Sequence, residues 1–188
     1  MKSLQNRLYE CTLHECPLHE CPLYEGFYQN AGGLVRPTTK DELMKEIRKR
    51  LRRHQTNLND IDTSRITDMS NLFVDIKLRQ NIDISQWDVS SVKDMHNMFY
   101  DCKDFNCDLS RWNVSNVENM NCMFFNCHNF NSDLSKWNVS NVKSMMEMFC
   151  GCINFNCDLS KWNVKKVKNM YYMFDDLGMK EKPSWYKS

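Results

Sequence analysis

Hydrophobic and polar positions repeat with a period of 25 residues through most of the chain. Units 108–132 and 133–157 are identical at 16 of 25 positions, which is the strongest pattern in the sequence. A more degenerate first unit, shifted by one residue, has Ile61 where the next unit has Trp87. A period of this length predicts stacked repeats rather than independent domains. We expect about five units, with the bounds 57–82, 83–107, 108–132, 133–157 and 158–182.

Each unit has the pattern of a short strand, a turn and a short helix. In 108–117 apolar residues are separated by polar ones, as in a half-buried strand and turn. From Val117 to Cys127 the apolar residues are three or four positions apart, which is the spacing of one helical face. Ser115 stands three residues before Glu118, a capping-box pattern that marks a helix start. We therefore predict an α/β solenoid of strand-turn-helix units.

Caps are needed at both ends of such an array. One unit cannot bury enough apolar surface to offset its own loss of backbone entropy, so it folds only against its neighbours. A capping box at 39–42 precedes three apolar residues on one helical face, which predicts a basic amphipathic capping helix in 36–56. We expect the polar stretch 179–183 to close the other end, followed by a C-terminal tail at 183–188. The three apolar residues are Leu43, Ile47 and Leu51.

The repeat resembles that of a known family. Its consensus D-L-S-x-W-N-V-S-N-V-x-x-M-x-x-M-F-x-x-C-x-N-F-N, with the lead-in segments P-T-T-K-D-E-L and D-I-D-T-S, is similar to BspA-like leucine-rich-repeat surface proteins, found mainly in bacteria. The resemblance covers residues 36–178 and implies a leucine-rich-repeat-like solenoid of about five units with an N-terminal capping helix. It further implies a binding role, host or matrix proteins as partners, and a location at the cell surface or outside the cell. It carries over no catalytic residues.

The sequence itself gives a different indication of location. No apolar run approaches the ~20 residues of a membrane-spanning helix. Glutamates interrupt the N-terminal stretch where the apolar core of a signal peptide would lie. The lack of this signal favours the cytoplasm, so the location stays open between the cytoplasm and the cell surface. The glutamates are Glu10, Glu15, Glu20 and Glu25.

One dense basic cluster lies in the predicted capping helix. The segment 36–56 carries eight basic and three acidic side chains, a net charge of +5, whereas the whole chain has +1. Such a cluster can bind nucleic acid, anionic lipid or an acidic partner, or it can be the solvated face of a helix, which we favour. The repeats add no further basic reading surface, so nucleic acid is disfavoured. The cluster is Lys45, Arg48, Lys49, Arg50, Arg52 and Arg53.

The N-terminal segment 1–35 combines cysteine and histidine, both common zinc ligands. They belong to a five-residue repeat, and no second pair follows at zinc-finger spacing. We favour a low-complexity, flexible tail, expect no cofactor, and keep metal binding as the weaker alternative. The candidate ligands are Cys11, His14, Cys16, His19 and Cys21.

Cysteine and tryptophan form rows in the repeat. Cys102, Cys127 and Cys152 recur at the repeat period, which predicts small buried thiols rather than disulfides. Cys122 and Cys150 lie outside this row and favour a reducing compartment. The tryptophans could form an exposed aromatic ladder, but the Ile at the first equivalent position favours burial. The row is Trp87, Trp112, Trp137 and Trp162.

The sequence contains no catalytic arrangement, such as a phosphate loop, a nucleophile elbow or a paired acidic motif. We therefore predict a non-enzymatic protein-binding module without a small-molecule substrate. The alternative is a cytosolic scaffold or regulator that uses the basic helix, and a metal- or nucleic-acid-binding role of the N-terminal region is less favoured. Candidate binding positions are the non-repeating residues His96, Arg111, Asn121, Lys136, Glu147 and Lys161.

Overall fold

The structure, a computed structural model, describes residues 34–76, 81–177 and 181–187. The chain divides into two units, Met1–Leu34 and Val35–Ser188, and the second contains the repeats. The predicted N-terminal tail lies almost entirely outside the described residues.

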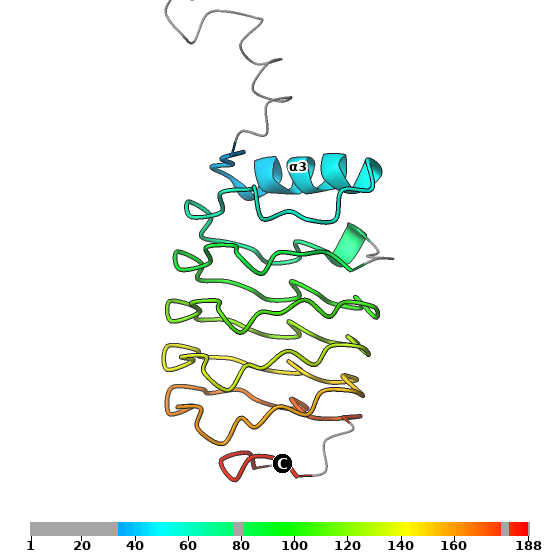
Figure 1. The fold of residues 1–188 in the computed structure, drawn as a ribbon. Coiled ribbons are helices and arrows are strands. Elements are labelled where there is room, and N and C mark those ends of the chain that lie inside the picture. The colour runs from blue at the N-terminus through cyan, green and yellow to red at the C-terminus, as the bar shows by residue number, and fades with distance from the viewer. Residues whose placement is uncertain (1–33, 77–80, 178–180, 188) are drawn as a thin grey trace, which may run out of the picture. The chain divides into compact units, whose positions relative to one another are not determined.

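One α-helix, α3 (Lys40–Arg52), lies within the segment expected to form a capping helix. The Thr39 side chain caps it by accepting a hydrogen bond from the Glu42 amide at 3.2 Å. The Glu42 carboxylate accepts in turn from the Thr38 amide at 2.7 Å, one residue earlier than in a standard capping box. Leu43 and Ile47 on its inner face are buried. The helix thus covers the first turn of the repeat array (Figure 1).

The predicted strand-turn-helix unit is wrong. Among the described residues, the only helical segments are α3 and a 3₁₀-helix, η1 (Val74–Ile76). The same residues hold no extended strand, only six isolated parallel bridges, such as Asp94 to Asn119 and Asn119 to Ser144. The prediction of an α/β leucine-rich-repeat-like solenoid is therefore overturned. Irregular turns of chain, each about one repeat long, lie one above another instead (Figure 1).

A backbone ladder between turns replaces the expected helix. The amides of Met95, Asn97, Phe99 and Asp101 donate to carbonyls of the next turn at 2.8–3.0 Å. The equivalent amides of the following two turns make the same bonds. A helix would direct each amide to the carbonyl four residues earlier in its own segment. The amides are thus used between turns, which is why the helix-like spacing did not produce a helix.

Left-handed residues at fixed places interrupt any helix in each turn. Cys122 has φ 52° and Asn126 has φ 55°, whereas a right-handed helix needs negative φ throughout. Asn, Asp and Gly adopt this conformation most readily, and they occupy most of the positions. Their recurrence was therefore the sequence signal against a helix. The two rows are Asn71, Asn97, Cys122, Glu147 and Tyr172, and Asp101, Asn126, Gly151 and Asp176.

Strain at one of these places gives a stability prediction. Glu147 has φ 54°, at a position that two earlier turns fill with Asn. A left-handed conformation costs an ordinary L-residue roughly 1–2 kcal/mol, and Asn pays less of this cost. We expect Glu147→Asn to raise the free energy of unfolding by about 0.5–1 kcal/mol in urea titrations. Glu147→Gln is the control, and an equal gain from it would assign the effect to charge instead.

Aromatic stacks fill the core between turns. Phe99, Phe124 and Phe149 stack with centroid distances of 5.5 and 5.7 Å. The tryptophans are buried, as predicted, at 3–4% exposure. Each indole donates to a carbonyl of the preceding turn, for example Trp137 to Leu109 at 3.0 Å. These bonds satisfy a buried donor and link neighbouring turns.

The C-terminal end is closed by an aromatic pair that the sequence analysis did not identify. Trp185 stacks on Trp162 at 6.4 Å and donates to the Leu159 carbonyl at 2.9 Å, so it continues the tryptophan row. Tyr186 packs edge-on against Phe174 at 4.9 Å. The spacing from Trp162 to Trp185 is 23 residues rather than 25, which hid the relation. Of the polar stretch expected to close this end, residues 179–180 lie outside the described part.

A row of buried and half-buried side chains that accept backbone hydrogen bonds explains why cysteine alternates with serine. The Ser132 hydroxyl accepts from the Leu109 amide at 2.8 Å. The Cys157 sulfur accepts from the Leu134 amide at 3.2 Å, and the Cys107 sulfur, one turn before Ser132, accepts from the Ile84 amide. Both residue types therefore satisfy a buried amide.

Ser132 can therefore be exchanged for Cys but not for Ala. Ser132→Ala leaves the Leu109 amide without its acceptor, which costs about 1–3 kcal/mol of unfolding free energy. Ser132→Cys should change it by less than about 1 kcal/mol, because Cys fills this position in both neighbouring turns. Urea titrations of the two variants give the comparison. An equal loss in both would show that sulfur cannot replace the hydroxyl here, and no loss in Ser132→Ala would show that the hydroxyl has no acceptor role.

Candidate binding surface

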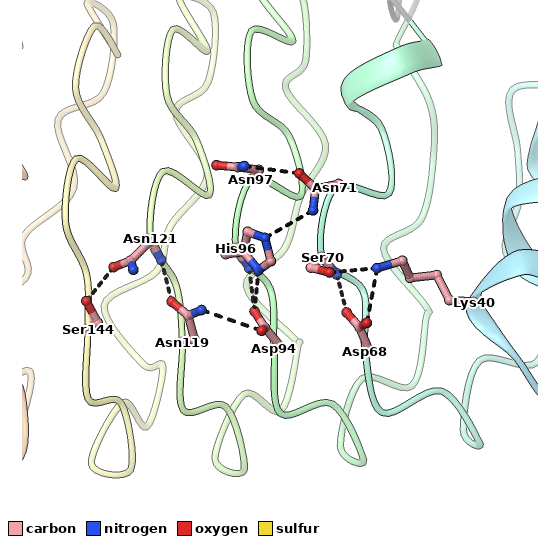
Figure 2. A network of polar contacts seen from close by, with 10 residues as sticks. All are labelled: Lys40, Asp68, Ser70, Asn71, Asp94, His96, Asn97, Asn119, Asn121 and Ser144. Carbon is pink, nitrogen blue, oxygen red and sulfur yellow. Dashed lines mark hydrogen bonds and ion pairs between the residues drawn. The ribbon is translucent and has the colours of Figure 1, made fainter.

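A chain of polar contacts begins where α3 meets the first turn. The Lys40 ammonium lies 3.0 Å from the Asp68 carboxylate and donates to the Ser70 hydroxyl at 2.6 Å (Figure 2). Partial burial acts to raise the pKa of Asp68, but the hydrogen bonds with Ser70 and the lysine together outweigh it and lower the pKa. The contacts attach the helix to the row of side chains along the ladder.

His96 is held between two turns. Its Nδ1 lies 3.0 Å from the Asp94 carboxylate, and its Nε2 lies 3.0 Å from the Asn71 amide nitrogen (Figure 2). Since the carboxylate only accepts and the amide nitrogen only donates, Nδ1 carries the proton of a neutral imidazole. The Asn71 amide oxygen accepts from Asn97 at 3.0 Å. Each ring nitrogen thus has a partner, which fixes the orientation of the ring.

Amide side chains continue the network into later turns. Asn119 donates to Asp94 at 3.5 Å, and the backbone amide of Asn121 donates to the Asn119 side chain at 3.1 Å. The Ser144 hydroxyl bonds to the Asn121 side chain at 2.5 Å (Figure 2). These half-buried groups are hydrogen-bond donors and acceptors that the neighbouring turns hold in place.

Two neighbouring rows along the ladder form what we call the ladder face. The predicted site residues His96 and Asn121 lie in one row, because their carbonyls accept equivalent ladder bonds. Glu147 does not join them, since it lies in the adjacent row with Asn97 and Cys122. The rows are Ser70, His96, Asn121, Met146 and Tyr171, and Asn71, Asn97, Cys122, Glu147 and Tyr172.

The ladder face changes character along the stack. The early turns present hydrogen-bonded polar groups, whereas Tyr171 is 72% exposed and Tyr172 is 61% exposed. Large exposed aromatic residues are frequent in the centres of protein interfaces. The C-terminal end of the ladder face, where these two tyrosines lie, is therefore the part of the face best suited to contact another protein.

The predicted basic positions lie along a separate line of shallow hollows. Lys136 and Lys161 line a hollow of about 530 Å³, and Arg111 lines another of about 540 Å³. Aspartates lie beside them, and the pKa of Asp108 is lowered by the hydrogen bonds it accepts from Ser110. Both hollows combine opposite charges, so neither attracts one sign of ligand strongly.

The basic cluster on α3 is partly neutralised. Arg50 contacts Glu46 at 2.7 Å and Asp60 at 2.8 Å, and Lys49 contacts Glu46 at 3.2 Å. Within the described ranges no acidic partner contacts the remaining four residues, all of them exposed. These four are Lys45, Arg48, Arg52 and Arg53.

The thiols of the described residues are free and mostly buried. Burial raises the pKa of Cys102 to about 12 and that of Cys127 well above its usual range. The Cys127 thiol donates to the Phe99 carbonyl at 3.0 Å. Cys122, one of the two cysteines outside the row, is buried, and Cys150 is half-buried. These thiols are protonated and poorly nucleophilic at neutral pH.

The predicted zinc ligands Cys11, His14, Cys16, His19 and Cys21 lie outside the described residues. Within the described part, no group of three or more His, Cys, Asp or Glu side chains could hold a metal ion. In the same part, no helix has both the length and the apolar character needed to cross a bilayer.

Sequence reasoning missed the partners that orient His96. Asp94, Asn71 and Asn97 belong to the repeat, so they were not separated from the scaffold residues. The signal that could have identified Asn71 and Asn97 was their position in the repeat. Both have a left-handed backbone conformation at a position that later turns fill with other residue types.

Comparison with known proteins gives one family. A family model described as "Mycoplasma protein of unknown function, DUF285" matches residues 42–140 and 111–183. The two matches overlap, as a repeating sequence permits, and together they cover more than half of the chain. No curated protein and no solved structure matches the chain.

Proposed function

The chain belongs to the DUF285 family of Mycoplasma proteins of unknown function, and we propose that it is a non-enzymatic module that binds another protein through the ladder face. One observation carries this proposal: a nearly constant core supports rows of different side chains at equivalent surface positions. The row with His96 changes from imidazole to amide, thioether and phenol, while the phenylalanines beneath it do not change. A ligand can read such differences only at the surface.

The C-terminal part of the ladder face supplies the contact residues. Tyr171 and Tyr172 together offer exposed aromatic area, and Met146 precedes Tyr171 in the same row. Tyrosine and methionine are enriched in protein interfaces because they bury much apolar area. The hydrogen-bonded His96 region supplies fixed polar groups beside this area.

Partner class follows from the resemblance of the repeat to BspA-like surface proteins. It supports a surface location and a host or matrix protein as partner. A cytosolic scaffold is the second candidate, and the free thiols favour it, because cysteines stay reduced in the cytosol, whereas disulfides form and persist in oxidising compartments. Protease treatment of intact producing cells distinguishes the two. Cleavage of the protein from outside supports the surface, whereas cleavage only after lysis supports the scaffold.

Photo-crosslinking tests the binding face. A photoreactive phenylalanine analogue replaces Tyr171 in one variant and Ile153 in another, since Ile153 is an exposed apolar residue outside the ladder face. Each purified variant is applied to matrix proteins and to a cytosolic extract. We expect one product of defined mass from the Tyr171 position, which excess unlabelled protein abolishes. The same products from both positions, or none from either, would contradict the proposal.

A further inference from the structure

The backbone ladder ends at the last turn, where its donors have no acceptors among the described residues. In earlier turns, groups such as the Glu147 and Phe149 amides donate to carbonyls of the following turn at 2.9 and 3.0 Å. The equivalent amides of the last turn have no acceptor among the described residues. These amides belong to Met170, Tyr172, Phe174 and Asp176.

The two ends of the ladder differ because most of its bonds run in one direction. Amides such as those of Met95, Asn97 and Phe99 donate to carbonyls of the following turn, whereas one column of amides, which ends in Lys168, donates to carbonyls of the preceding turn. Aligned amides of this kind concentrate partial positive charge and attract oxygen acceptors. At the opposite end α3 covers the first turn (Figure 1), and Lys40 lies beside Asp68 and Ser70 (Figure 2). Only the donor end is therefore left for an additional strand.

The C-terminal segment covers one part of the last turn and leaves the other part accessible. Trp185 and Tyr186 pack over Trp162 and Phe174, which closes the aromatic core. Tyr171 and Tyr172 remain largely exposed. The accessible edge thus runs from Lys165 to Tyr172.

Charge on this edge indicates what fits it. Lys165, Lys166 and Lys168 are all exposed on the last turn. In the row of Lys168, Glu118 forms an ion pair with Lys143 of the next turn. Lys168 is the last residue of this row. An acidic residue in an incoming strand would pair with Lys168 as Glu118 pairs with Lys143.

We propose that the last turn binds an extended acidic segment of a partner protein, which adds to the ladder as a further strand. Carbonyl groups of this segment accept hydrogen bonds from the Met170 and Tyr172 amides, and a carboxylate pairs with Lys168. Addition of a strand to an open edge is a common mode of peptide recognition. This edge shares Tyr172 with the ladder face, so the inference rests on the proposed function and deepens it. Protection of a backbone amide tests strand addition separately, because crosslinking at Tyr171 can succeed without it.

Amide exchange measured by NMR on the full chain tests the site. The probe is a peptide of alternating glutamate and threonine, and a lysine–threonine peptide is the control. We expect the acidic peptide to slow exchange of the Tyr172 amide and to leave the Glu147 amide, already bonded to the Tyr171 carbonyl, unchanged. No slowing at saturating peptide, or equal slowing by both peptides, would overturn the proposal.

Charge reversal provides the matched variants. Lys168→Glu should weaken binding of the acidic peptide about fivefold, which is the upper range for an exposed ion pair, and should improve binding of the basic peptide. Lys136→Glu changes the same charge away from the edge and should leave both affinities unchanged. An equal loss of affinity for the acidic peptide in the two variants would show that only the net charge of the protein matters, and it would contradict the proposal. Concentration-dependent dimers lost in Lys168→Glu would instead assign the edge to a second copy and overturn the proposal.

Discussion

Phe124→Ala is expected to lower the free energy of unfolding by about 3–5 kcal/mol, close to the whole stability of a small domain. Phe124 is fully buried and stacks on Phe99, Phe130 and Phe149 at 5.5, 4.1 and 5.7 Å. Its removal opens a cavity between three turns, and the ladder bonds on both sides prevent the turns from closing it. Equilibrium urea unfolding followed by tryptophan fluorescence measures the loss.

A surface tyrosine gives the control for this loss. Tyr171→Ala removes an aromatic ring that is 72% exposed, so it should change stability by less than about 0.5 kcal/mol. Phe124→Leu should retain part of the buried volume and lose less than Phe124→Ala. A loss below about 1 kcal/mol in Phe124→Ala would mean that the phenylalanine stack does not hold the turns together.

The sequence predicts the rows of this fold but not the path of the chain between them. Burial requires only that Val117, Met120 and Phe124 point inward, and consecutive turns satisfy this as well as a helix does. The choice between the two depends on where the backbone amides find acceptors, which is a long-range property. The local signal against a helix was the recurrence of residues that adopt the left-handed conformation at the position of Asn126 and its equivalents.

The candidate surface was predictable to a similar degree. Non-repeating residues identify variable positions, so His96 and Asn121 were named from sequence. Their common row depends on register, and one residue of offset placed Glu147 beside Cys122 instead. The hydrogen bonds of His96 with Asn71 and Asp94 join adjacent turns, so they could be known only from the structure.

Removal of residues 133–157 should leave a folded, shorter protein, whereas removal of 133–144 alone should abolish cooperative unfolding. The ladder and the stacked rings connect residues 25 positions apart, so only a whole period restores every row at the new junction. Half a period would place polar residues of one turn against the core of the next. Circular dichroism and urea titration distinguish the outcomes, and the shorter protein should show a smaller dependence of stability on urea.

Residues at the new junction explain why this unit is the one to remove. Trp162 would reach the Leu109 carbonyl that Trp137 now uses, so its buried indole keeps an acceptor. Glu118, now paired with Lys143, would face Lys168 with the same charge relation. Removal of 108–132 would instead bring Lys93 and Lys143 together, so that variant should be the less stable of the two. If both whole-period variants fail to fold, the turns are not equivalent, and specific contacts of each turn must maintain the stack.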